Sequence, residues 1–420
     1  MRPVVQNWSG TYIFAAPRLH RPGSVCQLRQ IVADARRTRA LGSGHSFNGI
    51  ADTEGELLDL RGLPCDFDID RQRGTVTVGA AMRYGDLAGH LHRHGLALHN
   101  MGSLPNITVA GATATGTHGS GDRNGNLATA VAGFERVDAE GNLLTAERGD
   151  AGFDGMVIGL GAFGIVTRVT LDVQPTFDVR QDAFAGLPWR TVLERLGEVM
   201  SGAYSVSLFT KWAGAHVDRL WLKSRLEDDR TLAVAAQHLG AVSANHAMVY
   251  GEDDPVSRLN PFGVVGPWSE RLTHFRSDRD PGSPEQIQSE MLVPRDRAVE
   301  ALEILRAMGD RIDPHLVTSE LRTVAADTLW LSASYGHDVV GIHFTWNKEP
   351  DAVDRLTAEI EGKLLPLGGR PHWGKVIHAP AQRLATLYPR MEEFRALAQR
   401  VDPGGKFRNA FLDRHVFGNG

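Results

Sequence analysis

Segments with helical spacing of apolar residues alternate with short segments of strand-like alternation along this 420-residue chain. Apolar positions between residues 25 and 35 recur at intervals of three and four behind a Pro-Gly-Ser start signal, which predicts a helix over residues 24–37. The same criteria predict helices over residues 84–94, 357–365 and 391–401, strands over residues 38–41, 75–79 and 169–173, and a hairpin across residues 134–146. The chain therefore mixes both kinds of element along its length.

Three strand-like segments, at residues 287–291, 319–323 and 342–346, carry two hydrogen-bonding or charged side chains at positions i and i+2. Because side chains alternate faces in a strand, each pair shares one face, while apolar residues take much of the other. An antiparallel sheet with one face in water has this pattern. A sheet whose polar face binds a ligand has it too.

After Pro175 the residue pattern changes to longer strand-like segments interrupted by helical ones. A chain of 420 residues is also too long for one ordinary hydrophobic core. We expect a first domain over residues 1–176 and a second over residues 177–371, the latter with a charged loop at 227–230. Residues 372–420 are expected to return to the first domain. The predicted organisation is thus two domains, the first of which is completed by the C-terminal segment.

Composition excludes several classes of function. With 42% hydrophobic residues, 23% charged residues and a net charge of -5, the chain is typical of globular proteins and is not a nucleic-acid binder. It has no signal-peptide pattern and no run of about 18 apolar residues, so we expect a cytoplasmic protein without a membrane partner. The two cysteines imply no disulfide framework. Without a coiled coil or an apolar stripe, a monomer is expected.

Histidines 90, 92 and 94 lie on one predicted helix and resemble a metal cluster at first sight. Residues two apart on a helix point in different directions, so adjacent members of this set cannot face one ion. We therefore expect no metal site there or elsewhere.

Two glycine-rich segments are the candidates for ligand binding. In residues 41–48, Leu-Gly-Ser-Gly-His-Ser-Phe-Asn, two glycines allow positive φ and let amide N–H groups converge on an anion such as a pyrophosphate, beside His45. Residues 102–121 are also dense in glycine and alanine, which predicts close approach of backbone to something other than side chains. Neither segment is a Rossmann fingerprint, because the third glycine and long helix are missing.

Four motifs in register resemble the alditol (xylitol) oxidases, FAD enzymes of the vanillyl-alcohol-oxidase-like superfamily. They are RALGSGHSFN, NMGSLPNITVAGATATGTHGSG, GAFGIVT at residues 161–167, and RPHWGK with the later DPGGKFRNAF. The resemblance implies an α+β, two-domain FAD-binding fold, with a cap domain built on a large antiparallel sheet flanked by helices. It also implies that the polar face of that sheet holds the substrate.

By this resemblance His45 is bound covalently, through its imidazole, to the flavin of FAD. The other FAD contacts that the resemblance and the small residues imply are Leu41, Gly42, Ser43, Gly44, Ser46, Phe47, Ser103, Thr108, Gly111, Ala112, Thr113, Ala114, Thr115, Gly116, Thr117, Ile165 and His372.

The resemblance places Lys375, Arg322 and Glu320 in the catalytic centre. A lysine buried beside an arginine has a lowered pKa, so Lys375 is our candidate base, while Arg322 stabilises the developing alkoxide. Glu320 accepts hydrogen bonds from substrate hydroxyls. Further substrate contacts implied are Ser103, Gln288 and Thr345, whereas His343 is either a neighbour of these contacts or a core histidine.

The expected reaction is FAD-dependent oxidation of the terminal primary hydroxyl of alditols such as xylitol and sorbitol to the aldose, with O₂ reduced to H₂O₂. Two positions depart from the family pattern: His99, which bears on chain-length preference, and Gly102, which we expect to ease access of O₂. The alternatives are a sugar-1,4-lactone oxidase of the gulonolactone or arabinonolactone type, and an FAD protein that carries electrons without oxidising alcohols.

Overall fold

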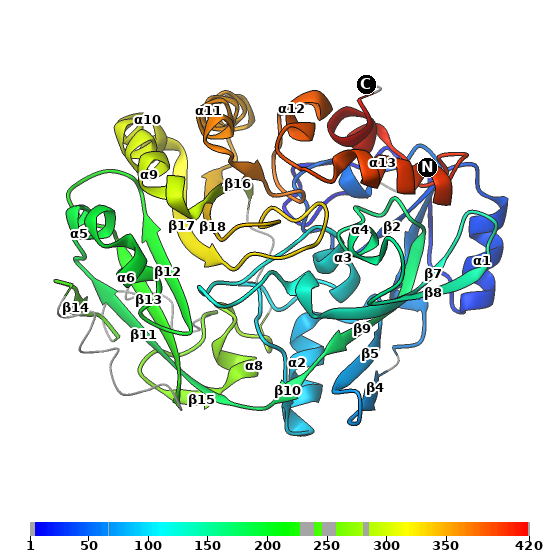
Figure 1. Cartoon of the computed structure of the whole chain (residues 1–420), viewed down its shortest axis with the longest axis horizontal. Coiled ribbons are helices and arrows are strands. Elements are labelled where there is room, and N and C mark those ends of the chain that lie inside the picture. The colour runs from blue at the N-terminus through cyan, green and yellow to red at the C-terminus, as the bar shows by residue number, and fades with distance from the viewer. Residues whose placement is uncertain (1–4, 66, 227–238, 246–257, 280–284, 419–420) are drawn as a thin grey trace.

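A computed structural model of the chain describes residues 5–65, 67–226, 239–245, 258–279 and 285–418 (Figure 1). The charged loop expected at residues 227–230 lies outside the described residues. The described parts form an α+β structure in which two groups of strands from successive parts of the chain lie side by side (Figure 1). The α+β class predicted from the sequence is confirmed.

Strands up to residue 175 form three small sheets. A three-stranded parallel sheet has the order β1-β3-β2, with β1 Arg18–His20, β2 Thr38–Leu41 and β3 Glu56–Asp59. A five-stranded antiparallel sheet has the order β4-β5-β9-β7-β8, with β4 Phe67–Asp70, β5 Thr75–Gly79, β7 Val131–Val137, β8 Leu143–Glu147 and β9 Ile165–Asp172. The remaining pair is β6 Leu96–Ala97 with β10 Gln174–Pro175. The expected strands and the expected hairpin are all present.

The helices of this part are α1 Val25–Asp34, α2 Tyr84–Arg93, α3 Val109–Ala114 and α4 Phe153–Val157. Ser24 caps α1 by accepting a hydrogen bond from the Gln27 amide, as its position before the apolar pattern predicts. The helix ends three residues before the predicted limit of residue 37, because Ala35 is extended. Helix α3 was not predicted; its sequence Val-Ala-Gly-Ala-Thr-Ala is short and contains a glycine and two β-branched residues, which are weaker helix formers than alanine.

A nine-stranded sheet dominates the rest of the chain, in the order β14-β11-β13-β12-β17-β18-β16-β19 with β15 also paired to β11. Its strands are β11 Asp178–Ala185, β12 Ser205–Thr210, β13 Arg219–Arg225, β14 Val242–Ser243, β15 Val265–Pro267, β16 Gln286–Pro294, β17 Leu316–Val324, β18 Val339–Asn347 and β19 Arg370–Pro371. All its pairings are antiparallel. The three segments with polar i, i+2 pairs are neighbouring strands, β17, β18 and β16.

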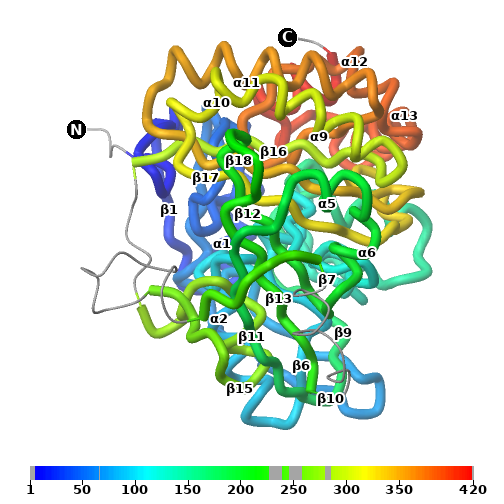
Figure 2. The backbone as a smooth tube through the Cα atoms, turned by 90° about the vertical axis from the view of Figure 1, so that its left-hand side faces the viewer, coloured from blue at the N-terminus to red at the C-terminus, as the bar shows by residue number. Residues whose placement is uncertain are grey.

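Helices α9, α11, α12 and α13 form a layer above the strands in both views (Figures 1 and 2). The helices of this part are α5 Trp189–Glu194, α6 Leu196–Met200, α8 Trp268–Arg271, α9 Ala298–Ala307, α10 Gly309–Ile312, α11 Pro350–Leu364, α12 Ala381–Ala385, α13 Met391–Val401 and α14 Ala410–Leu412. Ile342, Phe344 and Trp346 on β18 are fully buried in the core that includes the apolar faces of α9 and α11. One face of the sheet is thus covered, which leaves the polar face for a site.

No helix in the described ranges is long and apolar enough to cross a membrane. On α2, His92 contacts Thr176 through Nδ1 and His90 contacts Arg93, so these histidines have partners other than one another. Across the same ranges, no group of three or more histidine, cysteine or acidic side chains is placed to hold a metal ion. Cys26 and Cys65 are exposed, and neither forms a disulfide bond.

Candidate active site

A cavity of about 900 Å³ lies between the His45 loop, the second glycine-rich segment and the polar face of the large sheet. It is lined by most of the residues expected to contact FAD and by every expected substrate contact. The exceptions are Phe47, Thr113 and Gly116. Thr113 is buried and donates its hydroxyl to the Val109 carbonyl inside α3, whereas Gly116 takes a φ of +66° just beyond that helix.

The His45 loop is held by the N-terminal segment. The Trp8 amide donates to the Gly44 carbonyl at 2.8 Å, and the Asn7 side chain donates to the Ser46 carbonyl at 3.0 Å. Gly44 has a φ of +72°, a conformation that favours glycine. The Trp8 ring stacks on the His45 ring with centroids 4.6 Å apart. The orientation of the imidazole is therefore fixed by its neighbours.

Both ring nitrogens of His45 are buried, and neither makes a hydrogen bond of good geometry with a described residue, although the backbone of Ser43 lies close enough to affect the ring. Burial and, to a smaller extent, the nearby Lys375 lower the pKa of His45 to about 4. The imidazole is thus neutral at pH 7 and keeps an unprotonated nitrogen. Buried polar atoms are normally paired, so a ring without partners that faces a cavity indicates a bound group in that space.

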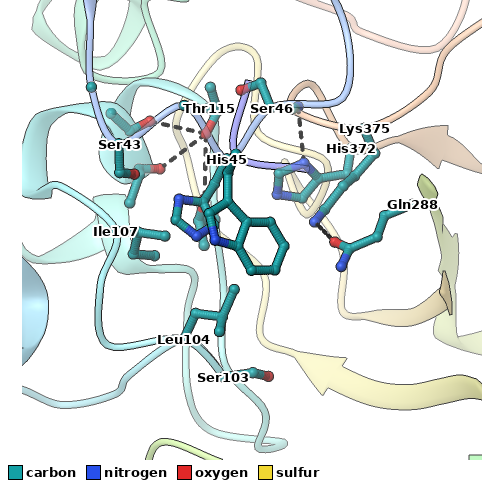
Figure 3. Close-up of a pocket in the computed structure, with 18 of the residues that line it drawn as sticks. Ser43, His45, Ser46, Ser103, Leu104, Ile107, Thr115, Gln288, His372 and Lys375 are labelled. Atoms are coloured by element: carbon teal, nitrogen blue, oxygen red, sulfur yellow. Dashed lines mark hydrogen bonds between the residues drawn. The ribbon is translucent and has the colours of Figure 1, made fainter. Parts of the chain in front are cut away.

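Segments far apart in the chain meet at the His45 loop. The Phe47 amide donates to the Gly374 carbonyl at 2.8 Å, and the Asn48 side chain donates to the carbonyls of Trp373 at 2.8 Å and Lys375 at 2.6 Å. These bonds bring Lys375 beside His45, as Figure 3 shows. The C-terminal motif and the histidine motif therefore form one site.

The polar side chains of β16, β17 and β18 gather on one face because of the strand register. Gln288 lies opposite Thr345, Glu290 lies opposite His343, and His343 also lies opposite Glu320. Directly opposed residues in antiparallel strands point to the same face. Glu290 and Glu320 are only 2% and 5% exposed and line the cavity, so this face does not lie in bulk water and the interpretation of a water-facing sheet is wrong.

Arg322 lies between two buried carboxylates. Its Nη2 donates to Glu290 Oε1 at 2.8 Å, its Nε lies 3.8 Å from Glu320 Oε1, and its Nη1 donates to Ser103 Oγ at 3.3 Å. Burial opposes ionisation of both carboxyls, but Arg322 and nearby histidines hold their pKa values below the usual range. Burial also opposes the charge of Arg322, yet the two carboxylates raise its pKa. All three groups are therefore charged.

Replacing Glu290 with glutamine is expected to lower the free energy of unfolding by about 3 kcal/mol at pH 7, because Arg322 loses a buried partner. The pKa of Glu290 is lowered in the folded state, so its contribution is present above the unfolded pKa of about 4.5 and is lost as pH falls through the folded pKa. Denaturant unfolding of both proteins at pH 7 and pH 4 measures this. An equal difference at both pH values would contradict it.

Lys375 is partly buried at the wall of the cavity and donates its ammonium to Gln288 Oε1 (Figure 3). Burial, assisted by Arg322 and opposed by Glu290, lowers the pKa of Lys375 to about 8. A substantial fraction of the amine is therefore neutral at mildly alkaline pH. Lys375 can accept a proton there, while Arg322 nearby keeps its charge.

Four residues at the site were not predicted to take part: Trp8, His118, Glu290 and His274, each of which lines the cavity. Glu290 could have been found, because it stands at i+2 from Gln288 in the same polar pattern. The other three lie in loops, where local sequence carries no signal of what they face. His99 does not line the cavity and instead contacts the Gly125 carbonyl, so the structure gives it no contact with a substrate there.

Comparison with known proteins supports a cavity that holds FAD. Residues 16–147 match the FAD binding domain family, and residues 279–415 match the D-arabinono-1,4-lactone oxidase family. The chain is 43% identical to alditol oxidase from Streptomyces sp. (strain IKD472 / FERM P-14339), over 98% of this chain and 99% of that protein. It is 30% identical to L-gulono-1,4-lactone dehydrogenase from Mycobacterium tuberculosis, over 99% of both.

Among solved structures, cholesterol oxidase from B. sterolicum superposes on this chain with a TM-score of 0.78 at 13% sequence identity. The superposition covers 99% of this chain and 97% of the cholesterol oxidase chain. At such low identity the similarity concerns the fold alone. It extends over both groups of strands, so the arrangement in Figure 1 is that of a known flavoenzyme-type fold.

Proposed function

Since the chain belongs to the FAD-dependent oxidoreductase family that includes the Streptomyces alditol oxidase, we propose that it oxidises the terminal primary hydroxyl of alditols such as xylitol and sorbitol to the aldose, with O₂ reduced to H₂O₂. The observation that carries this proposal is that Ser103, Gln288, Glu320, Arg322 and Lys375 line the same cavity as His45. Such a row of charged and hydrogen-bonding groups suits a ligand with several hydroxyls.

The cavity fits FAD by its shape and lining. The two glycine-rich segments lie against each other: a Cβ on Gly42 would lie 2.5 Å from the side-chain oxygen of Thr108 and 3.8 Å from the Cα of Gly111. Small and apolar residues such as Ala80, Ala81 and Ile165 line the other end, which suits a flat aromatic ring. The unpartnered ring nitrogens of His45 support a covalent bond between this histidine and the flavin. His372, whose Nδ1 accepts the Gly374 amide at 3.0 Å, borders the same space.

Bound FAD supplies the acceptor for the hydride that leaves the substrate carbon. The chain itself must remove the hydroxyl proton and stabilise the oxygen, because a free alcohol is a very weak acid. Lys375 accepts that proton when its amine is neutral, and Arg322 provides a fixed positive charge for the alkoxide. Glu320, Ser103, Gln288 and Thr345 bind the remaining hydroxyls and orient the chain of the substrate.

Substrate comparison tests the proposal. The purified protein is incubated with xylitol, sorbitol and a sugar-1,4-lactone, and H₂O₂ is measured with a peroxidase-coupled assay. We expect peroxide with the polyols and much less with the lactone, since the identity to the alditol oxidase exceeds that to the lactone dehydrogenase. Faster turnover of the lactone would favour the alternative. If none of the alcohols reduces the enzyme, the alternative of an FAD protein that carries electrons without oxidising alcohols is favoured.

Gly102 lines the cavity, and we expect its replacement by alanine to slow reoxidation of the reduced enzyme by O₂ several-fold. The added Cβ meets its nearest atom, Ile107 Cδ1, at 3.6 Å, so the substitution fits without a clash and only narrows the cavity. Stopped-flow absorbance after anaerobic reduction measures the rate. The control is Gly89→Ala on α2, where an added Cβ would have no contacting atom within 4 Å. An unchanged rate in Gly102→Ala would rule out this role of the glycine.

A further inference from the structure

A second buried lysine lies behind the substrate-facing groups. Lys223 on β13 is 1% exposed, and its Nζ has three acceptors: the carbonyl of Leu272 at 2.5 Å, the carbonyl of Thr273 at 3.1 Å, and His274 Nδ1 at 3.1 Å. An ammonium group has three hydrogens to donate and no acceptor. These acceptors suit the charged form of Lys223, and His274 is the only side chain among the three. Burial, assisted by Arg322 and opposed by Glu320, lowers the pKa of Lys223 to about 7, so both forms of the amine are populated at pH 7.

This arrangement determines where His274 carries its proton. The charged form of Lys223 can only donate and the Glu320 carboxylate can only accept, so between them a neutral ring accepts at Nδ1 and carries its hydrogen on Nε2. Burial and Lys223, opposed by Glu320, lower the pKa of His274 to about 4, which keeps the ring neutral at pH 7. Nε2 lies 2.8 Å from Glu320 Oε1. His274 consequently donates a hydrogen bond to one oxygen of the Glu320 carboxylate.

The ring of His274 cannot turn freely. Its backbone amide donates to the Ser103 carbonyl at 3.0 Å, and its ring meets the Trp221 ring edge-on at a centroid distance of 4.9 Å. The ring of Phe209 lies 5.9 Å away on another side. His274 is thus fixed between the loop that carries Ser103 and the strand that carries Glu320.

The two oxygens of Glu320 are consequently different. The protein contacts to this carboxylate within the described ranges, from His274 and from Arg322, are made to Oε1. Glu320 lines the cavity, so Oε2 is left to accept a hydrogen bond from a ligand. A hydroxyl group is a matching donor, whereas a methylene at the same place would leave a buried charged oxygen without a partner.

We propose that Lys223 and His274 are positioning residues, which act through Glu320 to select substrates with a second hydroxyl besides the one that is oxidised. The inference rests on the proposed function, because it assigns Glu320 to a substrate hydroxyl. Lys223 sets the tautomer of His274, and His274 in turn holds Glu320 Oε1 so that Oε2 faces the substrate. Neither residue exchanges a proton with the substrate, so each acts on binding more than on the chemical step.

The test uses the holoenzyme with Lys223→Met, His274→Phe and His274→Gln. Methionine and phenylalanine keep the approximate volume and remove the hydrogen bonds, while glutamine restores a donor toward Glu320. We expect KM for xylitol to rise roughly tenfold or more in the first two variants, with kcat changed less than about threefold, because a hydrogen bond to a charged group is lost. His274→Gln is expected to recover part of the loss. An unchanged KM in Lys223→Met or His274→Phe would overturn the proposal.

Asn260 supplies a matched control. Its side chain donates to the Thr273 carbonyl at 2.9 Å and to the Phe275 carbonyl at 3.4 Å, so it holds the same loop without contacting His274 or Glu320 by a side chain. Asn260→Ala is expected to lower thermal stability and leave KM near that of the parent. If Asn260→Ala raises KM as much as Lys223→Met does, the role of Lys223 is only to hold the loop.

Ring ¹⁵N NMR of histidine-labelled protein gives a readout that does not depend on turnover. The signals of His274, assigned by their absence from His274→Phe, should show a neutral ring with the hydrogen on Nε2 in the parent and a changed pattern in Lys223→Met. A parent ring with its hydrogen on Nδ1 would overturn the proposal. Failure of the parent to oxidise any polyol would instead overturn the proposed function, and the selection of substrate with it.

Discussion

Replacement of Lys375 with methionine is expected to lower kcat for xylitol oxidation by about a hundredfold to ten-thousandfold, the range that a positioned general base contributes. Methionine keeps the length and apolar character of the side chain but cannot accept a proton. In the parent, kcat/KM should rise with pH through the pKa of Lys375, about 8, because a base is active only when unprotonated. The variant should lose this rise. Steady-state kinetics between pH 6 and 10 measures both effects.

Gln288→Leu provides the control for Lys375. It removes the side chain that accepts the hydrogen bond from Lys375 Nζ, but it leaves the amine in place. We expect a higher KM and a retained dependence on pH, since binding is weakened while the base persists. If Lys375→Met keeps both the pH dependence and most of kcat, another group is the base and the assignment of Lys375 is wrong.

Replacement of His45 with alanine is expected to abolish covalent attachment of the flavin entirely. The imidazole is neutral, its nitrogens have no partner among the described residues, and the cavity begins at its edge. The protein is denatured with acid, and flavin absorbance is measured in the precipitate and in the supernatant. In the parent the colour should stay with the polypeptide, whereas in His45→Ala all of it should be released.

His372→Ala is the matched control for His45, because it removes another buried imidazole that lines the cavity. We expect this variant to keep its flavin attached after denaturation. Release of intact FAD from the parent would leave the fold and the cofactor in place but disprove the covalent bond. Retention of colour in His45→Ala would place the attachment at another residue.

Much of the local structure followed from the sequence because it depends on neighbouring residues. The helix behind Ser24, the strand at residues 75–79 and the helix at residues 391–401 have the predicted type and nearly the predicted limits. Their apolar spacing and start signals act within a few residues of chain. Helix α11 begins seven residues before its predicted start at Thr357, since Pro350 is accommodated in its first turn.

The partners of the predicted site residues depended on contacts that no local pattern encodes. Alternation placed Glu320 and Arg322 on one face of a strand, but the register of β16, β17 and β18 decided that Glu290 and His343 would join them. In the same way, His274 reaches Glu320 from a loop after α8, and Trp8 reaches His45 from the N-terminal segment.

By itself the sequence indicated a mixture of helices and strands through its periodicity, and the resemblance that its four motifs carry indicated the family and FAD; the catalytic residues that this resemblance implies stay predictions. Only the tertiary structure decided that the polar face of the sheet is closed off from water and that Lys375 lies beside the His45 loop. It also decided that Lys223 and Glu320 contact the two ring nitrogens of His274. The physical reason is that burial, charge pairing and pKa depend on the groups that pack together in space, which are distant in the chain.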